Sequence, residues 1–252
     1  MAHPAATTPK HVRATSRHTG RPTRDAERTR SAILDAATQE FARHGLGGAR
    51  VDRIATKADI NKRMLYHYFG AKEALFLAVL EATYARIRNA EQSLSLLDVK
   101  PAESVRRLIE FTWRYYLEHP EFLTLLNSEN LYRARHLKRS RRLQAMNSPV
   151  IDTLAKVLAR GEREGVFRPS VDPLQLYVSI AALAYFFLSN NHTLSAIFGR
   201  DLSTPAARRT RLTHMTAMVL GFLRPGSPDG RVALTRGNRQ KVVDKVVPPA
   251  RK

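Results

Sequence analysis

Apolar residues recur every three or four positions through most of the chain, from about residue 23 to residue 223. This spacing is typical of amphipathic helices, in which one face is buried against neighbouring helices. We find no alternation of apolar and polar residues long enough to predict a strand. The pattern therefore predicts an all-α protein.

Four helices are predicted in the N-terminal part. The first spans residues 23–44 and ends at Gly45, because glycine commonly stops a helix. Two short helices fall within residues 51–69, and a fourth begins near residue 71 and extends past residue 88. The apolar face of the first helix consists of Ile33, Ala37 and Phe41.

The two short helices are a predicted helix–turn–helix. The apolar faces that pack together consist of Val51, Ile54, Ala55 and Ala58 on the first, and Ile60, Met64, Leu65 and Phe69 on the second. Asn61 can cap the second helix through its side-chain oxygen. The outward side chains are mostly basic or aromatic: Lys62, Arg63, Tyr66, His67 and Tyr68. A helix of this size fits the DNA major groove, so these side chains are predicted to contact phosphates and base edges.

Prolines mark the helices of the C-terminal part. One helix is predicted over residues 101–118 and ends at His119-Pro120. Further helix starts are predicted where a capping residue precedes a proline. These pairs are Ser148-Pro149, Asp172-Pro173 and Thr204-Pro205. Gly165 and residues 224–226 are predicted stops.

The last two predicted helices, residues 173–197 and 205–223, are apolar on more than one face. On the first of them, one stripe consists of Leu176, Ile180, Leu183 and Phe187, and another of Tyr177, Ala181, Ala184 and Leu188. A helix that is apolar on two sides contacts its own core and something else. The alternative is that both faces are buried within one monomer.

The net charge of +20 and the pI near 11.0 predict a polyanionic partner. That partner is either nucleic acid or an anionic membrane surface, although a GC-rich genome also enriches arginine. Both ends of the chain are basic and lack an apolar period, which predicts disorder. The N-terminal segment is either an arm along the DNA minor groove or a solvated tail.

Several classes of site are excluded by the sequence. The chain has no cysteine, so disulfides, thiolate zinc sites and a cysteine nucleophile are absent. It also lacks a glycine-rich phosphate loop, a Gly-x-Ser-x-Gly elbow and a His-Glu-x-x-His helix. Its nine histidines are scattered. We therefore predict no catalytic residue, no metal and no cofactor, and the protein is not expected to be an enzyme.

Membrane and export segments are not predicted either. The N-terminus lacks the pattern of a secretory signal. The most apolar run, residues 178–188, is shorter than the roughly 18 residues that a membrane span needs. A soluble, cytoplasmic protein without a membrane partner is expected.

The residues quoted above also carry a family resemblance. The run Ala32-Ile-Leu-Asp-Ala-Ala-Thr-Gln-Glu-Phe-Ala-Arg-His-Gly45 and the run Leu65-Tyr-His-Tyr-Phe-Gly-Ala-Lys-Glu-Ala-Leu75 resemble the N-terminal domain of TetR-family transcriptional regulators. The resemblance covers residues 28–80. It departs at Ala58-Asp59-Ile60, where the family usually has Ala-Gly-Val, and at Arg63, where a small residue or proline is common. Aspartate tolerates a left-handed backbone better than most residues.

The resemblance implies a homodimeric regulator, most often a repressor, that a small-molecule effector releases from a palindromic operator. The last two helices would form a four-helix bundle across a two-fold axis, and the central bundle would hold the effector. Residues 120–130 and 188–201 are more weakly similar to a subgroup that includes regulators of nicotinate or pyrimidine breakdown. The alternative function is a non-specific architectural DNA-binding protein.

The implied organisation is a disordered basic arm (1–22), a three-helix helix–turn–helix DNA-binding domain (23–72), a helical effector-binding and dimerisation domain (73–224) and a disordered basic tail (225–252). The predicted DNA contacts are Arg50, Val51, Asn61, Lys62, Arg63, Tyr66, His67, Tyr68 and Lys72. The predicted effector contacts are Trp113, Tyr116, Phe122, Asn127, Asn130, Arg133 and Tyr185.

Overall fold

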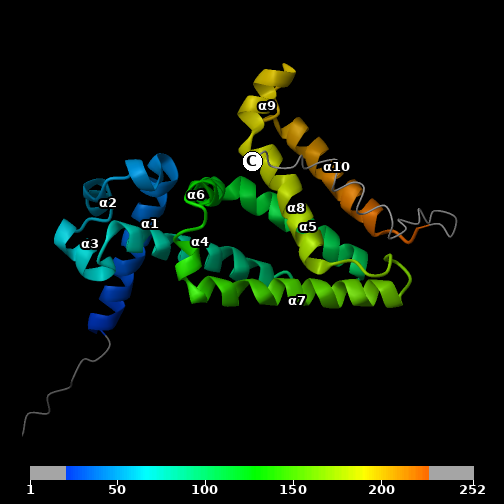
Figure 1. The fold of residues 1–252 in the computed structure, drawn as a ribbon, viewed down its shortest axis with the longest axis horizontal. Helices are drawn as coiled ribbons and strands as arrows, with labels where there is room; N and C mark the ends of the chain where they lie inside the picture. Colours follow the sequence, from blue (N-terminus) through cyan, green and yellow to red (C-terminus); the bar gives the residue numbers. More distant parts are fainter. Residues whose placement is uncertain (1–20, 227–252) are drawn as a thin grey trace, which may run out of the picture. The chain divides into compact units, whose positions relative to one another are not determined.

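The computed structural model describes residues 21–226. All regular elements of this part are helices, and no strand occurs in it (Figure 1), which confirms the predicted all-α class. The chain divides into two compact units, one ending at Val79 and the other beginning at Leu80. This division falls within a helix, after the boundary predicted at residue 72. Most of both predicted tails lies outside the described residues.

The first unit contains α1 (Arg21–Gly48), α2 (Val51–Lys57), α3 (Lys62–Phe69) and the start of α4 (Lys72–Gln92). Gly45 has a non-helical backbone, with φ 62° and ψ 177°, inside α1. The predicted stop is therefore a kink, after which the chain makes one more turn. Fully buried side chains join these helices: Ile33, Phe41, Ile54, Leu65, Leu75 and Phe76.

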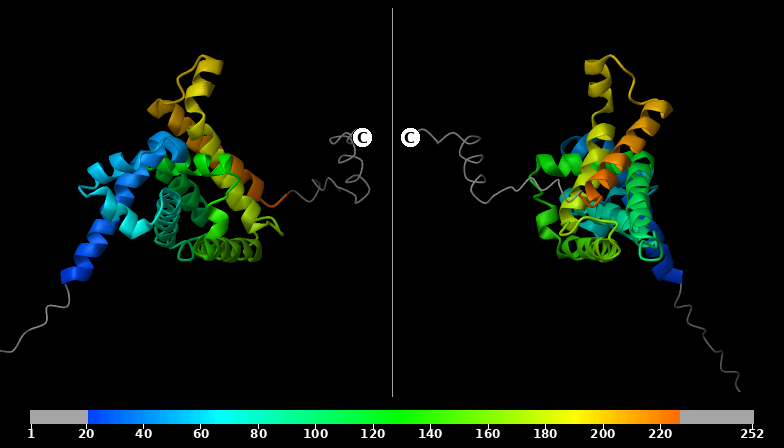
Figure 2. Two further views of the ribbon diagram at one scale, coloured as in Figure 1. Left: turned by 60° about the vertical axis from the view of Figure 1, so that its left-hand side comes forward. Right: turned by 90° about the vertical axis from the view of Figure 1, so that its right-hand side faces the viewer.

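The second unit contains the rest of α4, α5 (Pro101–Glu118), α6 (Pro120–Leu131), a 3-10 turn (Leu137–Arg139), α7 (Arg141–Arg163), α8 (Pro173–Ser189), α9 (Asn191–Phe198) and α10 (Pro205–Leu223). Helix α5 packs against α7, α8 and α10, and α8 lies beside α10 (Figures 1 and 2). The core between them includes Val105, Leu108, Ile109, Leu154, Val157, Ile180 and Met215.

Capping side chains fix the starts of α8 and α10 as predicted. The Asp172 carboxylate accepts hydrogen bonds from the backbone N–H groups of Leu174 (2.8 Å) and Gln175 (3.2 Å). The Thr204 hydroxyl accepts one from Ala207 N–H (3.2 Å). These bonds satisfy donors that the first helical turn cannot pair. The predicted boundary at His119-Pro120 is confirmed by the end of α5 at Glu118.

The helix start predicted at Pro149 is wrong. Pro149 lies inside α7, which begins at Arg141. The Ser140 hydroxyl caps this helix by accepting a hydrogen bond from Leu143 N–H (3.3 Å). A proline inside a helix removes one backbone hydrogen bond, and here the helix continues on both sides of it.

The single long helix predicted over residues 173–197 is also wrong, because the chain breaks at Asn190. Helices α8 and α9 are bent by 66° at this point. The Asn190 side chain donates to Phe186 O (2.9 Å), a local bond of the kind that competes with helix continuation. Within the described residues no single helix meets the length and hydropathy of a membrane span, and only the bent α8–α9 pair does so jointly.

The two apolar stripes predicted on α8 both lie largely against the core of their own unit. Leu176, Ile180 and Ala184 are buried, and most of the remaining stripe residues pack against them half-buried. A third row, which the sequence analysis did not single out, faces outward instead. It consists of Leu174, Val178 and Phe186, each at least half exposed. Met218 and Phe222 of α10 are similarly exposed. We call these five residues the outer apolar row.

Candidate DNA-binding site

Helices α2 and α3 are held by buried side chains of the first unit. Val51, Ile54 and Ala55 are buried on α2, and Leu65 is completely buried on α3. The prediction that Met64 packs inward is wrong, because its side chain is 37% exposed. Helix α3 has only eight residues, so its inward face is narrow and Leu65 occupies most of it.

The turn between α2 and α3 has the left-handed residue that the sequence predicted. Asp59 has φ 53°. Its N–H donates to Thr56 O (3.2 Å), and Ile60 N–H donates to Ala55 O (3.1 Å). These bonds satisfy the carbonyl groups at the end of α2. An aspartate therefore fills the place where glycine is usual, and the sharp turn is kept.

Asn61 caps α3, as predicted. Its Oδ1 accepts a hydrogen bond from Met64 N–H (2.8 Å). Arg63, Tyr66 and His67 are exposed on the outer side of α3. Tyr68 is half-buried, and its ring contacts those of His67 and Phe69 at centroid distances of 5.9 and 6.4 Å. The exposed side chains thus form one basic and aromatic surface, with Tyr68 at its edge.

Lys62 is not free on this surface. Its Nζ lies 2.8 Å from the Asp52 carboxylate on α2. The hydrogen bond between these two groups, and then their opposite charges, raise the pKa of Lys62 and lower the pKa of Asp52. Sequence analysis did not identify Asp52. The position of an acid in the first turn of α2, facing the start of α3 across the turn, was the available signal.

Arg50, Val51 and Lys72, which were predicted to contact the DNA backbone, differ in how exposed their side chains are. The Arg50 side chain is exposed, and its backbone N–H donates to Glu40 Oε1 (3.0 Å). Lys72 is half-buried, with Nζ 3.5 Å from Gly47 O. Val51 is only 8% exposed, so its side chain supports the core. The Arg30 guanidinium lies over the Phe69 ring at 5.3 Å, a contact at the end of α3 that the sequence did not indicate.

The seven predicted effector residues do not converge on one pocket. Trp113, Tyr116 and Phe122 are at most 6% exposed, and Tyr116 stacks on Phe122 at 5.7 Å. These three are core residues. Asn130 and Arg133 are exposed on the surface.

Two of the seven do meet. Tyr185 donates a hydrogen bond to the Asn127 side chain, and Asn127 Nδ2 donates to Ser189 Oγ (3.1 Å). This small polar group joins α6 to α8. None of the seven predicted residues lines any of the three hollows described below.

The second unit also contains two buried polar clusters whose internal bonds the sequence did not predict. Arg88 Nη1 bonds to the Glu91 carboxylate and to the Tyr177 hydroxyl (2.8 Å), and Tyr177 also donates to Glu91 (3.2 Å). Glu129 accepts from His136 N–H (2.7 Å) and Leu137 N–H (3.0 Å), and lies 2.7 Å from His136 Nδ1. Burial raises the pKa of Glu91.

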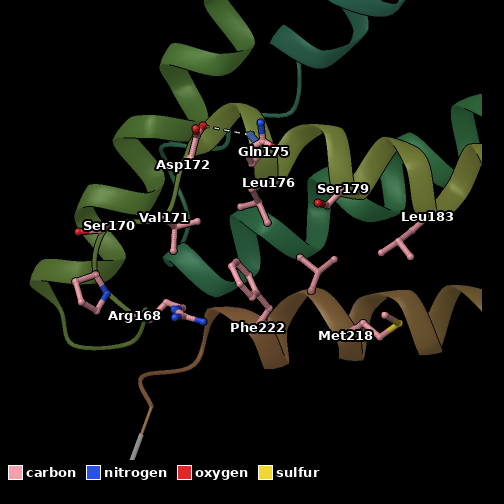
Figure 3. A pocket seen from close by; sticks show the side chains of 12 residues that line it. Arg168, Ser170, Val171, Asp172, Gln175, Leu176, Ser179, Leu183, Met218 and Phe222 are labelled. Atoms are coloured by element: carbon pink, nitrogen blue, oxygen red, sulfur yellow. Dashed lines mark hydrogen bonds between the residues drawn. The ribbon is translucent and has the colours of Figure 1, made fainter. Parts of the chain in front are cut away.

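Among the hollows that the described residues form, three lie on the second unit. The first, about 490 Å³, lies between α8 and α10 beside the segment 168–172. Figure 3 shows Leu176 of α8 opposite Phe222 of α10, and Leu183 further along α8 on the side of Met218. The Arg168 guanidinium lies 4.9 Å from the centroid of the Phe222 ring. The second, about 270 Å³, includes Arg88 and Glu91. The third, about 370 Å³, is bounded by Phe187 and the start of α10. No three acidic or histidine side chains of the described part are grouped to hold a metal ion.

Both units match models of known protein families. The profile of "Bacterial regulatory proteins, tetR family" matches residues 33–79. The profile of "Tetracyclin repressor-like, C-terminal domain" matches residues 101–219. The first match contains the whole of α2 and α3, and the second extends from α5 into α10.

Individual relatives match over most of their length. The HTH-type transcriptional repressor NicS of Pseudomonas putida is 40% identical over 209 residues, which cover 83% of this chain and 99% of the relative. The HTH-type transcriptional regulator RutR of Escherichia coli is 26% identical over 207 residues, covering 82% and 96%. The crystal structure of the transcriptional regulator SCO4942 of Streptomyces coelicolor superimposes with a TM-score of 0.60 at 28% identity, covering 78% and 99%.

Proposed function

Because the chain belongs to the TetR family of bacterial transcriptional regulators, we propose that it represses transcription by reading a specific operator with α3. The observation that carries this proposal is the exposure of Arg63, Tyr66 and His67 on one side of α3. The opposite side of the helix is anchored by Leu65, which is completely buried. A helix fixed in this way can enter the major groove as a rigid element.

The residues of the reading surface take different roles in this proposal. Arg63, Tyr66 and His67 contact base edges and phosphates, and Asn61 retains its amide N–H₂ as a donor because only its oxygen caps α3. Arg50 and Lys72 contact the backbone, and Lys62 does so after leaving Asp52. The Val51 side chain is buried, which leaves only its backbone N–H for such a contact. Tyr68 orients His67 through the contact between their rings.

We propose a homodimer in which the outer apolar row of α8 and α10 faces the same row of a second copy. Leu174, Val178 and Phe186 are 50–57% exposed, and burying such a row in a symmetric interface is favourable. Two copies of α3 would then read half-sites about 34–36 Å apart, so the operator would be an inverted repeat.

The dimer would be released from its operator by a small-molecule effector bound in the second unit. NicS, by its name, is a transcriptional repressor, and the weaker resemblance of residues 120–130 and 188–201 suggests a nitrogen-heterocycle pathway. Coupling between effector and operator must be reciprocal, so operator DNA should weaken effector binding by the same factor. The protein would act in the cytoplasm, and we assign no catalytic role to any residue.

The test begins with selection of bound fragments from sheared genomic DNA of the source organism at about 150 mM salt, which weakens non-specific binding. Fragments sharing an inverted repeat are expected. Lys62→Ala and Tyr66→Ala should then each weaken binding to that repeat by about tenfold, since one base or phosphate contact is lost. Lys156→Ala, an exposed lysine of α7, is the charge-matched control.

Equal recovery of all fragments by the effector-free protein would reject operator reading. It would favour the non-specific architectural alternative, which the net charge of +20 would then explain. Unchanged affinity of both α3 variants for the repeat would instead reject α3 as the reading helix.

A further inference from the structure

The third hollow of the second unit differs from the other two in its charge. It lies between the end of α8, the segment 199–204 and the first half of α10. Its volume is about 370 Å³. The apolar part of its lining consists of Phe187, Leu202, Ala206 and Ala207. The charged or titratable part consists of Arg200, Asp201, Arg211 and His214.

The single acid of this lining is already engaged. Asp201 accepts hydrogen bonds from the backbone N–H (2.8 Å) and the hydroxyl (2.6 Å) of Ser203. These bonds lower the pKa of Asp201, so it stays ionised as the acceptor of a local turn. Ser203 is neutral and does not cancel the charge of Asp201, so Arg200 and Arg211 together exceed this one carboxylate by one positive charge at the hollow.

Arg211 is a partly buried cation without an acidic partner among the described residues. Its Nη2 donates to Leu183 O (2.8 Å), and its guanidinium lies over the Phe187 ring at 5.5 Å. Its Nε is buried and has no hydrogen-bond partner in the described part of the chain. Burial alone lowers the pKa of Arg211.

Arg88, which is buried in the same unit, shows the contrast. It is paired with Glu91 and with the Tyr177 hydroxyl, and these partners raise its pKa despite burial. A buried cation without an anion is costly. An anion that entered the third hollow would give Arg211 a negatively charged hydrogen-bond partner, as Glu91 does for Arg88.

The walls of the hollow are fixed by contacts of their own. The Phe187 ring packs against Trp113 at 5.8 Å. The Ser195 hydroxyl accepts a hydrogen bond from Leu202 N–H (2.9 Å), and Thr204 caps α10. The hollow is therefore formed in advance by α8, α9 and α10, which favours ligand binding because little has to be ordered.

We propose that this hollow is the effector site and that its ligand is a small carboxylate with a compact apolar body. The carboxylate would bind between Arg211 and Arg200, because the guanidinium fork matches a carboxylate in two parallel hydrogen bonds. The apolar body would lie against Phe187 and Leu202. A volume near the lower end of the range for ligand pockets limits the molecule to a small size.

This site would also explain how the ligand acts, and in that respect it rests on the proposed function. The ligand contacts both α8 and α10, which carry the outer apolar row of the proposed dimer. Drawing Arg211 toward a carboxylate changes its contacts with Leu183 and Phe187 on α8. A shift between these two helices would alter the dimer interface, and with it the spacing of the two α3 helices.

The test measures ligand binding to the full chain by calorimetry, without DNA. Benzoate and hexanoate are the probes, their uncharged amides are the matched controls, and inorganic phosphate tests charge alone. We expect the carboxylates to bind more tightly than their amides and than phosphate. Arg211→Gln and Arg200→Gln should each weaken carboxylate binding by at least about tenfold, because a charged partner is removed. Arg209→Gln should bind as the wild type does.

Arg209 is exposed on the same helix and does not line the hollow, so it controls for net charge. Arg200 is exposed as well, so Arg200→Gln is expected to fold. It therefore tests the site even if Arg211→Gln unfolds the protein. The proposal is overturned if both carboxylates fail to bind, if amides or phosphate bind equally well, or if Arg200→Gln binds normally. Loss of operator recognition in the separate DNA assay would reject the proposed function and leave this binding result standing.

Discussion

At the scale of single residues, Lys62 has two competing partners. In the free protein its ammonium group lies 2.8 Å from the Asp52 carboxylate, whereas bound DNA would offer it a phosphate. Asp52 is exposed beside the reading surface, where its negative charge opposes the approach of DNA. The ion pair therefore holds Lys62 in place at a cost in affinity for DNA.

Replacing this acid tests the competition. Asp52→Asn should raise operator affinity by about two- to five-fold, since it removes an exposed ion pair and a repulsive charge. The measurement is a binding titration at two salt concentrations. Asp152→Asn makes the same change of charge on an exposed position of α7 and should have little effect. Weaker binding by Asp52→Asn would show that Asp52 positions Lys62 for DNA.

At the scale of elements, the end of α7 depends on the absence of a side chain. The chain turns at Gly165, which has φ 68°, and returns the buried Phe167 ring onto Gly161. A Cβ at Gly161 would lie 2.0 Å from Phe167 Cδ2. Helix and ring can thus pack only because position 161 is glycine.

Gly161→Ala should consequently destabilise the protein by about 1–3 kcal/mol, the usual cost of overpacking a core. Thermal or urea unfolding followed by circular dichroism measures this. The control is Gly48→Ala, where the new Cβ would lie 3.5 Å from His44 Cβ, an ordinary contact. Equal stability of the two variants would contradict the packing at the end of α7.

Helix α5 carries a second element-scale prediction, which concerns alkaline pH. Burial raises the pKa of Tyr115 to about 12, whereas an unfolded tyrosine ionises near 10.0. The folded state therefore keeps this proton longer than the unfolded state. The resulting stability is present below pH 10 and is lost as the pH rises from 10 to about 12.

Tyr115→Phe should retain the stability of the wild type at neutral pH and lose less of it above pH 10. Urea unfolding at a series of pH values measures the slope. Tyr66→Phe removes an exposed tyrosine hydroxyl and is the control for the loss of a hydroxyl group. The same slope in wild type and Tyr115→Phe would exclude a delayed ionisation at this position.

At the scale of the whole molecule, the proposed dimer depends on the outer apolar row. Val178 is central in this row on α8 and is 50% exposed. Val178→Asp should weaken the dimer by at least about tenfold, because a charge would be buried without a partner. Sedimentation velocity over a range of concentrations measures the dissociation constant, and operator binding should fall in parallel.

The control for this prediction is Leu131→Asp. Leu131 is the last residue of α6 and is 85% exposed. Leu131→Asp therefore also replaces an exposed apolar side chain by a carboxylate, but outside the outer apolar row. We expect it to remain dimeric. A monomeric wild type, or equal dimerisation of both variants, would reject the interface on α8 and α10.

The sequence predicted best those features of the fold that are fixed by interactions between residues close together in the chain. The caps at Asp172 and Thr204 were predictable, because each accepts hydrogen bonds from N–H groups two or three residues ahead. The left-handed Asp59 and the cap at Asn61 were predictable for the same reason. Pro149 was misread, since an equally local cap at Ser140 had already started the helix.

The candidate sites divide in the same way. The outward residues of α3 followed from helical period and the anchoring Leu65, and family resemblance gave them their roles. The effector residues were chosen for their aromatic or polar type, which does not distinguish a pocket from a core. Trp113 and Tyr116 proved to be core. Arg211 was not considered, because its lack of an acidic partner appears only when α8 and α10 are placed together.

The sequence by itself determined the helical class, most helix starts, the helix–turn–helix and the family. These rest on hydrogen bonds and side-chain periods within a few residues of the chain. Only the tertiary structure decided which row of α8 faces outward, that Asp52 holds Lys62, and that Tyr177 meets Arg88 across 89 positions of sequence. Such contacts depend on how the helices pack. Packing is determined jointly by many side chains that are far apart in the sequence, so the local spacing of residues does not reveal it.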